Sequence, residues 1–532
     1  MLTTQQNKIV SWSFRTEEKA CDGARLYAKV TAPGGSVKTV PAFLAGDGRM
    51  HVRYASNEQG IHAYTMAWED QSERWPAGET DRIEVVPYLG DNPLYLHGRI
   101  RRAEGKRYLE HTDRTPFFYL ADTWWMGFTK RIHFPDEFVA LTADRVEKGF
   151  NVVQIVAGLY PDMDAFDERG MNDAGFAWNK DFTEINAAYF DDAEQRLFHL
   201  IEQGITPCIV GSWGYYCNMA PPEAIRRHWD HLIARWSAYP VIWCIAGEAT
   251  MPYYLTSPGA PQVEDMRGYW TQMGHYIKEN DPFDNLMTVH PTQRGHEQVD
   301  DESLLGFNML QTGHRGPFSL LNSIQEVQEC LPLNNLPILI AEACYEGICG
   351  SSGADTQRYL LLASVLTGCC GFGYGAQGLW QMSAKHEPYG VSPHGASWGD
   401  GYWDDVYKLL GSTHVGYIKR FFERFTWWDF EPNMAWIENP CSYTAIDGSY
   451  AAGIPGKVRF IYLPLFGLDF GGNALVKDIE PGITYFAYYY DPIHDDVLDL
   501  GEVFPDENGC WTSPKTIAYH DWVLVLSVDK LQ

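Results

Sequence analysis

The feature that most constrains the fold is a regular alternation of apolar strand-like runs and helical segments between about residues 117 and 375. Eight such β/α units in succession are typical of a (β/α)8 TIM barrel. A doubly wound parallel sheet is the alternative, but it rarely contains eight units of this regularity. The predicted strands span residues 117–121, 152–157, 207–210, 241–246, 286–290, 306–310, 337–341 and 370–375.

The helical segments carry start and stop signals of their own. Pro135 suits the first turn of a helix, Phe138, Leu141 and Val146 recur at helical spacing, and Gly149 provides a stop. The further predicted helices span residues 191–203, 222–237, 265–279, 319–330 and 355–367.

Both ends of the chain read as short strands separated by turns. Pro33-Gly34-Gly35 and Gly46-Asp47-Gly48 supply turn chemistry near the N-terminus. We therefore predict an α/β protein with a β-sandwich at residues 1–105, the barrel at 106–428 and a second β-sandwich at 429–532. The strands expected in the two sandwiches span residues 9–14, 25–31, 37–44, 51–54, 62–68 and 82–87, then 443–446, 458–462, 483–490 and 522–527.

Composition excludes several classes of partner. The chain has 41 basic and 69 acidic side chains and a net charge of −28, so its surface repels nucleic acid. It contains no apolar run of about 18 residues, so no membrane span is expected. Nineteen Trp and 31 Tyr suit stacking on sugars, although an aromatic-rich all-β core explains them equally well.

The eleven cysteines point to a reducing compartment. They form no CxxC pair and no metal-ligand spacing, and several lie in or beside apolar runs. The first ten residues contain no apolar stretch of the kind found in signal peptides. We therefore expect a cytoplasmic protein whose cysteines are reduced.

Two carboxylates decide the functional interpretation. Glu248 and Glu342 directly follow the fourth and seventh predicted strands, and a TIM barrel places its catalytic groups at such carboxyl ends. An isolated Glu there would be read as a solvated loop residue, but a pair across the barrel mouth can flank one bond. One carboxyl that protonates the leaving oxygen and one that attacks the anomeric carbon are what retaining glycoside hydrolysis needs.

The sequence also resembles a known family. The segments 115–125 (TPFFYLADTWW), 148–154 (KGFNVVQ), 239–243 (YPVIW) with Gly247-Glu248, and 337–342 (PILIAE) resemble glycoside hydrolase family 140, the apiosidases and their relatives. The resemblance implies a retaining, exo-acting hydrolase with Glu342 as nucleophile and Glu248 as acid/base. The chain departs from the family in having Glu248 where Asp is expected. It also has Gly247 where the wider clan of barrel glycosidases usually has Asn.

Other residues at or near strand ends are candidate substrate contacts. Aromatic rings there would stack on a sugar, and polar groups would orient it. For Asp122, Trp124 and Trp125, the competing interpretation is a core or capping role. For His290 and His314, it is that they are loop histidines whose hydrogen bonds are satisfied within the protein. The long segment 159–189 is expected to cover one side of the cleft. The candidates are Asp122, Trp124, Trp125, Gln154, Trp213, Tyr215, His290, Gln311, His314, Tyr345, Gln377 and Trp380.

Three motif-like patterns do not support a cofactor or a metal. Residues 373–378 match G-x-G-x-x-G but do not open an obvious helix. His296-Glu297 lacks the second histidine of a zinc motif. Asp162, Asp164 and Asp167 lack the glycine and terminal Glu of a calcium loop. We expect neither cofactor nor metal.

The expected function is removal of a terminal sugar, apiose-like or another pentose or deoxy sugar, from a small plant-type glycoside or oligosaccharide. An arabinofuranosidase or rhamnosidase on the same scaffold is one alternative, and a non-catalytic carbohydrate-binding protein is another. Retention of both Glu248 and Glu342 argues against the binding protein. The expected partner is a small-molecule glycoside, with no nucleic acid and no membrane. The sugar, its linkage and the oligomeric state are left open by the sequence.

Overall fold

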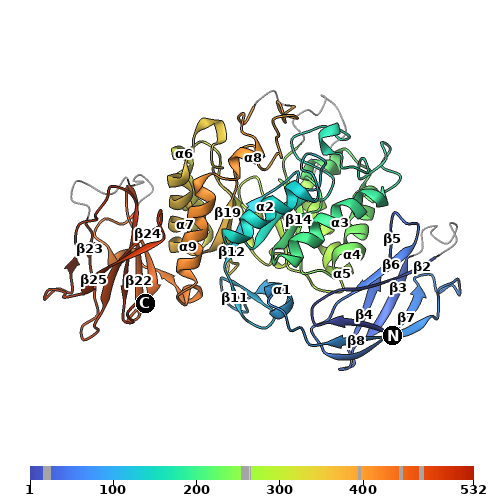
Figure 1. The fold of residues 1–532 in the computed structure, drawn as a ribbon, viewed down its shortest axis with the longest axis horizontal. Coiled ribbons are helices and arrows are strands. Elements are labelled where there is room, and N and C mark those ends of the chain that lie inside the picture. Colours follow the sequence, from blue (N-terminus) through green and yellow to red (C-terminus); the bar gives the residue numbers. More distant parts are fainter. Residues whose placement is uncertain are drawn as a thin grey trace.

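The structure is a computed structural model that describes residues 1–15, 25–252, 263, 265–393, 397–441, 447–465 and 473–531. Three parts follow one another along the longest axis (Figure 1). A β-domain, drawn in blue, lies at the N-terminal end, a barrel surrounded by helices lies in the middle, and a second β-domain, in red, holds the C-terminus. No helix in these described ranges is long and apolar enough to cross a membrane.

The central sheet confirms the predicted barrel. Eight strands lie in the order β16-β15-β14-β13-β12-β19-β18-β17, and each strand pairs in parallel with the next one in this order. The two end strands meet where the Gly306 amide donates to the Met287 carbonyl at 2.7 Å. The strands are β12 (Tyr119–Thr123), β13 (Val152–Val156), β14 (Thr206–Val210), β15 (Ile242–Gly247), β16 (Met287–His290), β17 (Asn308–Gln311), β18 (Ile338–Glu342) and β19 (Cys369–Tyr374).

Helices follow the strands around the outside of the barrel (Figure 1). Helix α2, which follows β12, ends as predicted, since Gly149 just beyond it adopts φ 84°, a conformation that glycine takes at little cost. The helix α9, which the sequence did not predict, follows a long segment after β19. The helices are α1 (Pro93–Leu96), α2 (Asp136–Glu147), α3 (Ala187–Glu202), α4 (Pro222–Trp236), α5 (Met266–Asn280), α6 (Pro317–Cys330), α7 (Ala354–Thr367), α8 (Trp403–Val406) and α9 (Leu410–Phe422).

The N-terminal domain contains two sheets, as predicted for a β-sandwich. One has the order β1-β8-β7-β3-β4 and the other β2-β6-β5, with apolar side chains of both in a common core. A small sheet of order β11-β10-β9 follows this domain along the chain and precedes the barrel. The strands are β1 (Leu2–Gln5), β2 (Val10–Phe14), β3 (Leu26–Thr31), β4 (Val37–Pro41), β5 (Phe43–Leu44), β6 (Met50–Tyr54), β7 (Gly60–Trp68), β8 (Thr80–Val86), β9 (Ile100–Arg102), β10 (Leu109–His111) and β11 (Pro116–Phe117).

The C-terminal domain has a sheet of order β20-β21-β22-β27-β24-β25 and a short pair, β23-β26. The predicted strand 443–446 lies outside the described residues. Strand β25 was not predicted, because most of its side chains are exposed and only Leu498 and Leu500, both partly buried, pack against the core of this domain. The strands are β20 (Glu431–Pro432), β21 (Tyr450–Ile454), β22 (Val458–Leu463), β23 (Leu475–Val476), β24 (Phe486–Asp491), β25 (Asp496–Glu502), β26 (Trp511–Thr512) and β27 (Trp522–Ser527).

An apolar interface joins the C-terminal sheet to helices α7 and α9. Phe421 of α9 stacks on Tyr490 of β24, with ring centroids 3.8 Å apart. The Arg358 guanidinium of α7 contacts the Asp521 carboxylate at 2.6 Å, and both side chains are buried. The core of the barrel therefore continues into this domain.

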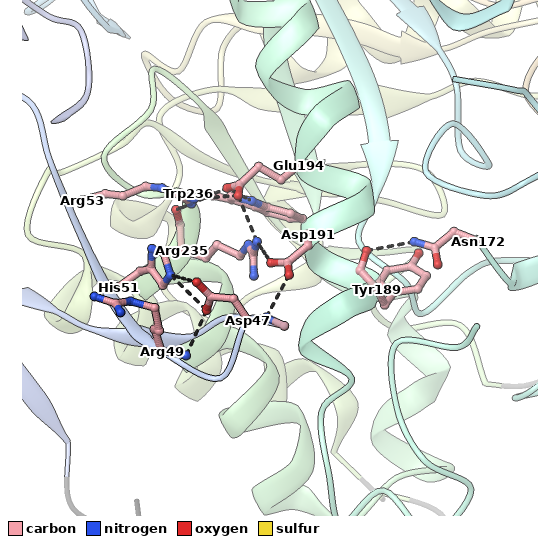
Figure 2. Close-up of polar contacts among 11 residues, drawn as sticks. Asp47, Arg49, His51, Arg53, Asn172, Tyr189, Asp191, Glu194, Arg235 and Trp236 are labelled. Atoms are coloured by element: carbon pink, nitrogen blue, oxygen red, sulfur yellow. Dashed lines mark hydrogen bonds and ion pairs between the residues drawn. The ribbon is translucent and has the colours of Figure 1, made fainter. Parts of the chain in front are cut away.

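The interface of the N-terminal domain is more polar (Figure 2). The Arg53 guanidinium of β6 pairs with the Glu194 carboxylate of α3, which also accepts from Arg235 at 2.9 Å. The Gly46 amide donates to Asp191 of the same helix at 2.8 Å. Hydrogen-bonded charges, rather than apolar area alone, hold this domain against α3 and α4.

Candidate active site

A pocket of about 260 Å³ opens at the carboxyl ends of the barrel strands. Residues that end strands or lie in the loops after them form its wall, as expected for a TIM barrel. Both predicted carboxylates face it. The lining residues are Trp125, Pro161, Asp162, Trp213, Glu248, Met251, Gln311, His314, Glu342, Tyr345, Ile348, Trp380 and Trp398.

Glu248 is held in an unusual backbone conformation just after β15. Its φ is +46°, a region that residues other than glycine rarely adopt. The pairing of β15 with β16 shifts register between Cys244 and Gly247, and such irregularities re-aim the side chains that follow.

Gly247 makes room for a partner of Glu248. A Cβ at position 247 would lie 2.2 Å from the Trp213 ring, so no larger residue fits there. The Trp213 indole N–H donates to Glu248 Oε2 at 3.1 Å. The departure from Asn at this position therefore has a physical cause, because the Trp213 ring occupies the space beside the carboxylate.

Glu342 is the last residue of β18, and two histidines contact it. His314 Nε2 lies 2.8 Å from Oε1, and His290 Nε2, at the end of β16, lies 3.0 Å from Oε2. Each carboxylate oxygen thus has its own imidazole.

Gln311 connects the two carboxylates. Its side-chain amide nitrogen, at the end of β17, lies 3.1 Å from Glu248 Oε1 and 3.0 Å from Glu342 Oε1. Since both oxygens lie around one nitrogen atom, they are no more than 6.1 Å apart. Glu248 and Glu342 therefore face the same small volume.

The two carboxylates differ in acidity. Burial, and then the charge of Glu342, raise the pKa of Glu248 above its ordinary value. Burial opposes ionisation of Glu342 as well, but hydrogen bonds from His290 and His314 hold the pKa of Glu342 well below its usual range. Burial lowers and the bond to Glu342 raises the pKa of His314, with a net increase. At a given pH, Glu248 therefore holds its proton more tightly than Glu342 does.

Half of the predicted substrate contacts line the pocket. Trp125, Trp213 and Trp380 contribute aromatic surface, and Gln311, His314 and Tyr345 contribute polar groups. The Trp380 indole nitrogen and the Tyr345 hydroxyl are buried and lack a geometrically sound hydrogen bond within the structure. His290 is placed beside Glu342, and its ring packs edge-on against Trp125.

Asp122 and Trp124 lie elsewhere, so their prediction as substrate contacts is not supported. Both are completely buried, and Asp122 Oδ2 accepts from Arg145 Nε at 2.5 Å and from the Trp124 indole at 2.8 Å. Arg145 belongs to α2, on the outside of the barrel. The sequence carried a signal for this placement, because Arg145 lies on the apolar face of α2, seven residues after Phe138, where a buried charge needs a charged partner.

Gln154, Tyr215 and Gln377 are also predicted contacts that do not line the pocket. Gln154 donates to the Ala341 carbonyl at 2.9 Å, one residue before Glu342. The Tyr215 hydroxyl donates to the Tyr160 carbonyl at 2.8 Å, in the long loop after β13. Gln377 accepts from the Gly401 amide at 2.7 Å. All three fix backbone around the site.

Five lining residues were not predicted as contacts. Pro161 and Asp162 belong to the long loop after β13, which therefore does form part of the pocket wall. The unusual length of this loop was the feature of the sequence that pointed to a place in the pocket wall. Nothing in the sequence distinguishes the other three, Met251, Ile348 and Trp398. Within the described ranges, no group of three or more His, Cys, Asp or Glu side chains is arranged to hold a metal ion.

Comparisons with known proteins agree with this fold. Solved structures with the same fold include a glycoside hydrolase at 20% identity (82% of this chain, 98% of the other, TM-score 0.68). A family 5 glycoside hydrolase from Bacteroides vulgatus is 21% identical over 81% of this chain and 93% of its own (TM-score 0.66). A putative glycoside hydrolase from the same species is 16% identical over 99% of this chain and 100% of its own (TM-score 0.69). The comparison with functionally curated proteins found no match to the chain.

The family comparison is more specific than these likenesses of fold. The apiosidase-like catalytic domain matches residues 103–429, which is more than half of the chain and includes both carboxylates and the whole barrel. The chain belongs to the apiosidase-like family of glycoside hydrolases.

Proposed function

We propose that the protein is a retaining, exo-acting glycosidase that removes a terminal apiose-like sugar, or another pentose or deoxy sugar, from a small glycoside. The observation that carries the proposal is the single Gln311 amide shared by Glu248 and Glu342. If that amide gives one hydrogen to each, about 120° apart, the two oxygens lie about 5.3 Å apart. Retaining enzymes have a separation of about 5–5.5 Å, and inverting enzymes about 6.5–9.5 Å.

The acidities assign the two roles. Glu342, ionised and held by two imidazoles, is suited to attack the anomeric carbon. Glu248, whose pKa is raised by burial and by the Glu342 charge, is suited to keep a proton for the leaving oxygen. Opposite shifts in one pair of carboxyls are the usual signature of an acid and a nucleophile.

Two displacements complete the reaction. In the first, Glu342 forms a bond to the anomeric carbon as the glycosidic bond breaks, and Glu248 gives its proton to the departing oxygen. In the second, Glu248 takes a proton from water, the water oxygen bonds to the anomeric carbon, and Glu342 is released. The charge on Glu342 disappears in the intermediate, so the pKa of Glu248 falls when it must act as a base.

The size of the pocket supports action at a chain end. A volume of about 260 Å³ lies below the roughly 300–1,000 Å³ of pockets that hold drug-sized ligands, so it suits one sugar unit. The rings of Trp125, Trp213 and Trp380 offer stacking surface for the C–H face of that sugar. The apiose-like specificity is proposed from the family alone.

The cysteines support a cytoplasmic location. All ten cysteines in the described ranges are unpaired, and seven of them are buried. Free thiols in such number suit a reducing compartment. An enzyme there would meet imported glycosides rather than polymers.

A panel of nitrophenyl glycosides that includes furanosides tests the proposal. We expect turnover of one pentoside or deoxyglycoside, with the first-formed sugar in the same anomeric configuration by NMR. Glu342→Gln should abolish turnover, and Glu248→Gln should spare nitrophenyl substrates while losing alkyl glycosides. Glu297→Gln, an exposed carboxylate on a neighbouring loop, is the matched control. Sugar binding without turnover on every substrate would instead indicate a carbohydrate-binding protein.

A further inference from the structure

We propose that the leaving-group side of the pocket accepts an uncharged, apolar aglycone, preferably aromatic, rather than a second sugar or a uronic acid. This inference rests on the proposed function, because it places the leaving group by reference to the acid Glu248. It adds the class of substrate, which neither the family nor the fold supplies.

The leaving group must lie toward the opening of the pocket. The floor is closed by the barrel core, since the residues of β15 and β18 that precede the two carboxylates are all buried. One sugar fills most of a volume of about 260 Å³, so whatever is attached to it extends outward past Glu248. The two apolar lining side chains that remain partly exposed, Met251 and Trp398, mark that opening.

Met251 lies on the acid side of the opening. It follows Glu248 by three residues, and its amide donates to the Glu248 carbonyl at 2.9 Å, which closes a tight turn. The group that receives a proton from Glu248 must therefore pass this side chain. Methionine is flexible and polarizable, and its sulfur packs well against aromatic rings.

Trp398 lies on the nucleophile side. Its ring centroid is 6.2 Å from that of His314, which binds Glu342. Its carbonyl accepts from the Cys349 amide at 3.0 Å, which ties it to the turn that carries the buried lining residue Ile348. Ile348 and Trp398 thus form one apolar wall of the pocket.

Among the residues that the structure describes, few polar groups lie at the opening. Most of the polar lining side chains are the two carboxylates and their neighbours Trp213, Gln311, His314 and Tyr345. Among the other described lining residues, Asp162 is the one with a charged side chain, and its Oδ2 already accepts from the Ser392 hydroxyl. A second sugar would bury several hydroxyls against Met251, Ile348 and Trp398 without partners, which is unfavourable. An apolar ring makes no such demand.

Charge excludes an acidic leaving group. Asp162 and the ionised Glu342 face the same pocket, and the chain carries a net charge of −28. A uronic acid at the opening would bring another carboxylate toward this group, and like charges repel most strongly where water is displaced.

Alkyl glycosides separate binding of the aglycone from leaving-group chemistry. Methyl, cyclohexylmethyl and benzyl glycosides of the accepted sugar release alcohols of similar acidity, so kcat/KM reports contact with the aglycone. We expect the wild-type enzyme to prefer benzyl over methyl by about tenfold or more. A disaccharide with glucose as leaving group, and its glucuronate analogue, complete the series.

Single substitutions at the opening show which side chains contact the aglycone. Met251→Gln and Trp398→Ser should each reduce the benzyl-to-methyl ratio several-fold, and Trp398→Phe should restore most of it. Phe504→Ser, which removes an exposed aromatic ring of the C-terminal domain, should leave the ratio unchanged. The wild-type series decides the question even if a variant fails to fold.

The outcomes separate the two proposals. Equal kcat/KM for the methyl and benzyl glycosides, or preference for the disaccharide or the glucuronate, would overturn the apolar aglycone site while leaving the hydrolase intact. Absence of turnover on every glycoside of the panel would overturn the proposed function, and this inference with it.

Discussion

Replacing His314 by Phe tests how the ionised state of Glu342 is maintained. The change keeps a flat ring of similar size and removes the nitrogen that lies 2.8 Å from Glu342 Oε1. A hydrogen bond to a charged group contributes about 1.5–3 kcal/mol. Since one pKa unit corresponds to about 1.4 kcal/mol, the pKa of Glu342 should rise by about 1–2 units.

The remaining contacts limit the effect. Glu342 keeps His290 at 3.0 Å and the Gln311 amide at 3.0 Å, so it stays ionised at neutral pH. The acidic limb of kcat/KM, which reports deprotonation of the nucleophile in the free enzyme, should therefore move to higher pH by about 1–2 units.

The assay is a pH–rate profile on a nitrophenyl glycoside, with thermal unfolding followed at each pH. His199→Phe, on helix α3 and outside the pocket, is the control and should not move the limb. An acidic limb unchanged in His314→Phe, with only a lower kcat, would show that His314 supports the site sterically and would refute the electrostatic reasoning.

Three other expectations concern stability. Because the pKa of Glu248 is raised in the folded state, the protein loses stability as pH rises through that pKa, and Glu248→Gln should unfold at a higher temperature than wild type near pH 8. This advantage should vanish below about pH 4, where the carboxyl is protonated in both states. Asp122→Asn removes one of the two carboxylates that pair with the buried Arg145 charge and leaves Asp144, so it should cost about 1.5–3 kcal/mol in urea unfolding, with KM little changed. Deletion of residues 430–532 exposes the apolar faces of α7 and α9, including Phe421, and should give aggregates by size-exclusion chromatography; a soluble, active fragment would contradict the shared core.

The barrel and the two carboxylates were predictable because the signals are local. Strands β15 and β18 are apolar runs, and Glu248 and Glu342 stand at their carboxyl ends. Recognising the two residues at these ends required no knowledge of how the chain packs. The strand period of two also separates Trp125, which faces the pocket, from Asp122 and Trp124, which face α2. Applying that period to this segment corrects the prediction for Asp122 and Trp124.

The rest depends on contacts between distant segments. Met251 and Trp398 reach the opening from loops after β15 and β19, and neither lies within a periodic pattern. The acidity of Glu342 depends on His290 and His314, which come from the fifth and sixth barrel units. Loop conformation of this kind is set by the whole barrel rather than by the sequence of each loop.

Covalent labelling tests the central claim most directly. A 2-deoxy-2-fluoro derivative of the accepted sugar, with an activated leaving group, should slow the second displacement and leave the sugar bound to the nucleophile. Mass spectrometry of a proteolytic digest should then find one sugar on the peptide that contains Glu342, and none in Glu342→Gln. A label on Glu248, or time-dependent inactivation without any label on the protein, would contradict the assignment of Glu342 as the nucleophile of a retaining pair.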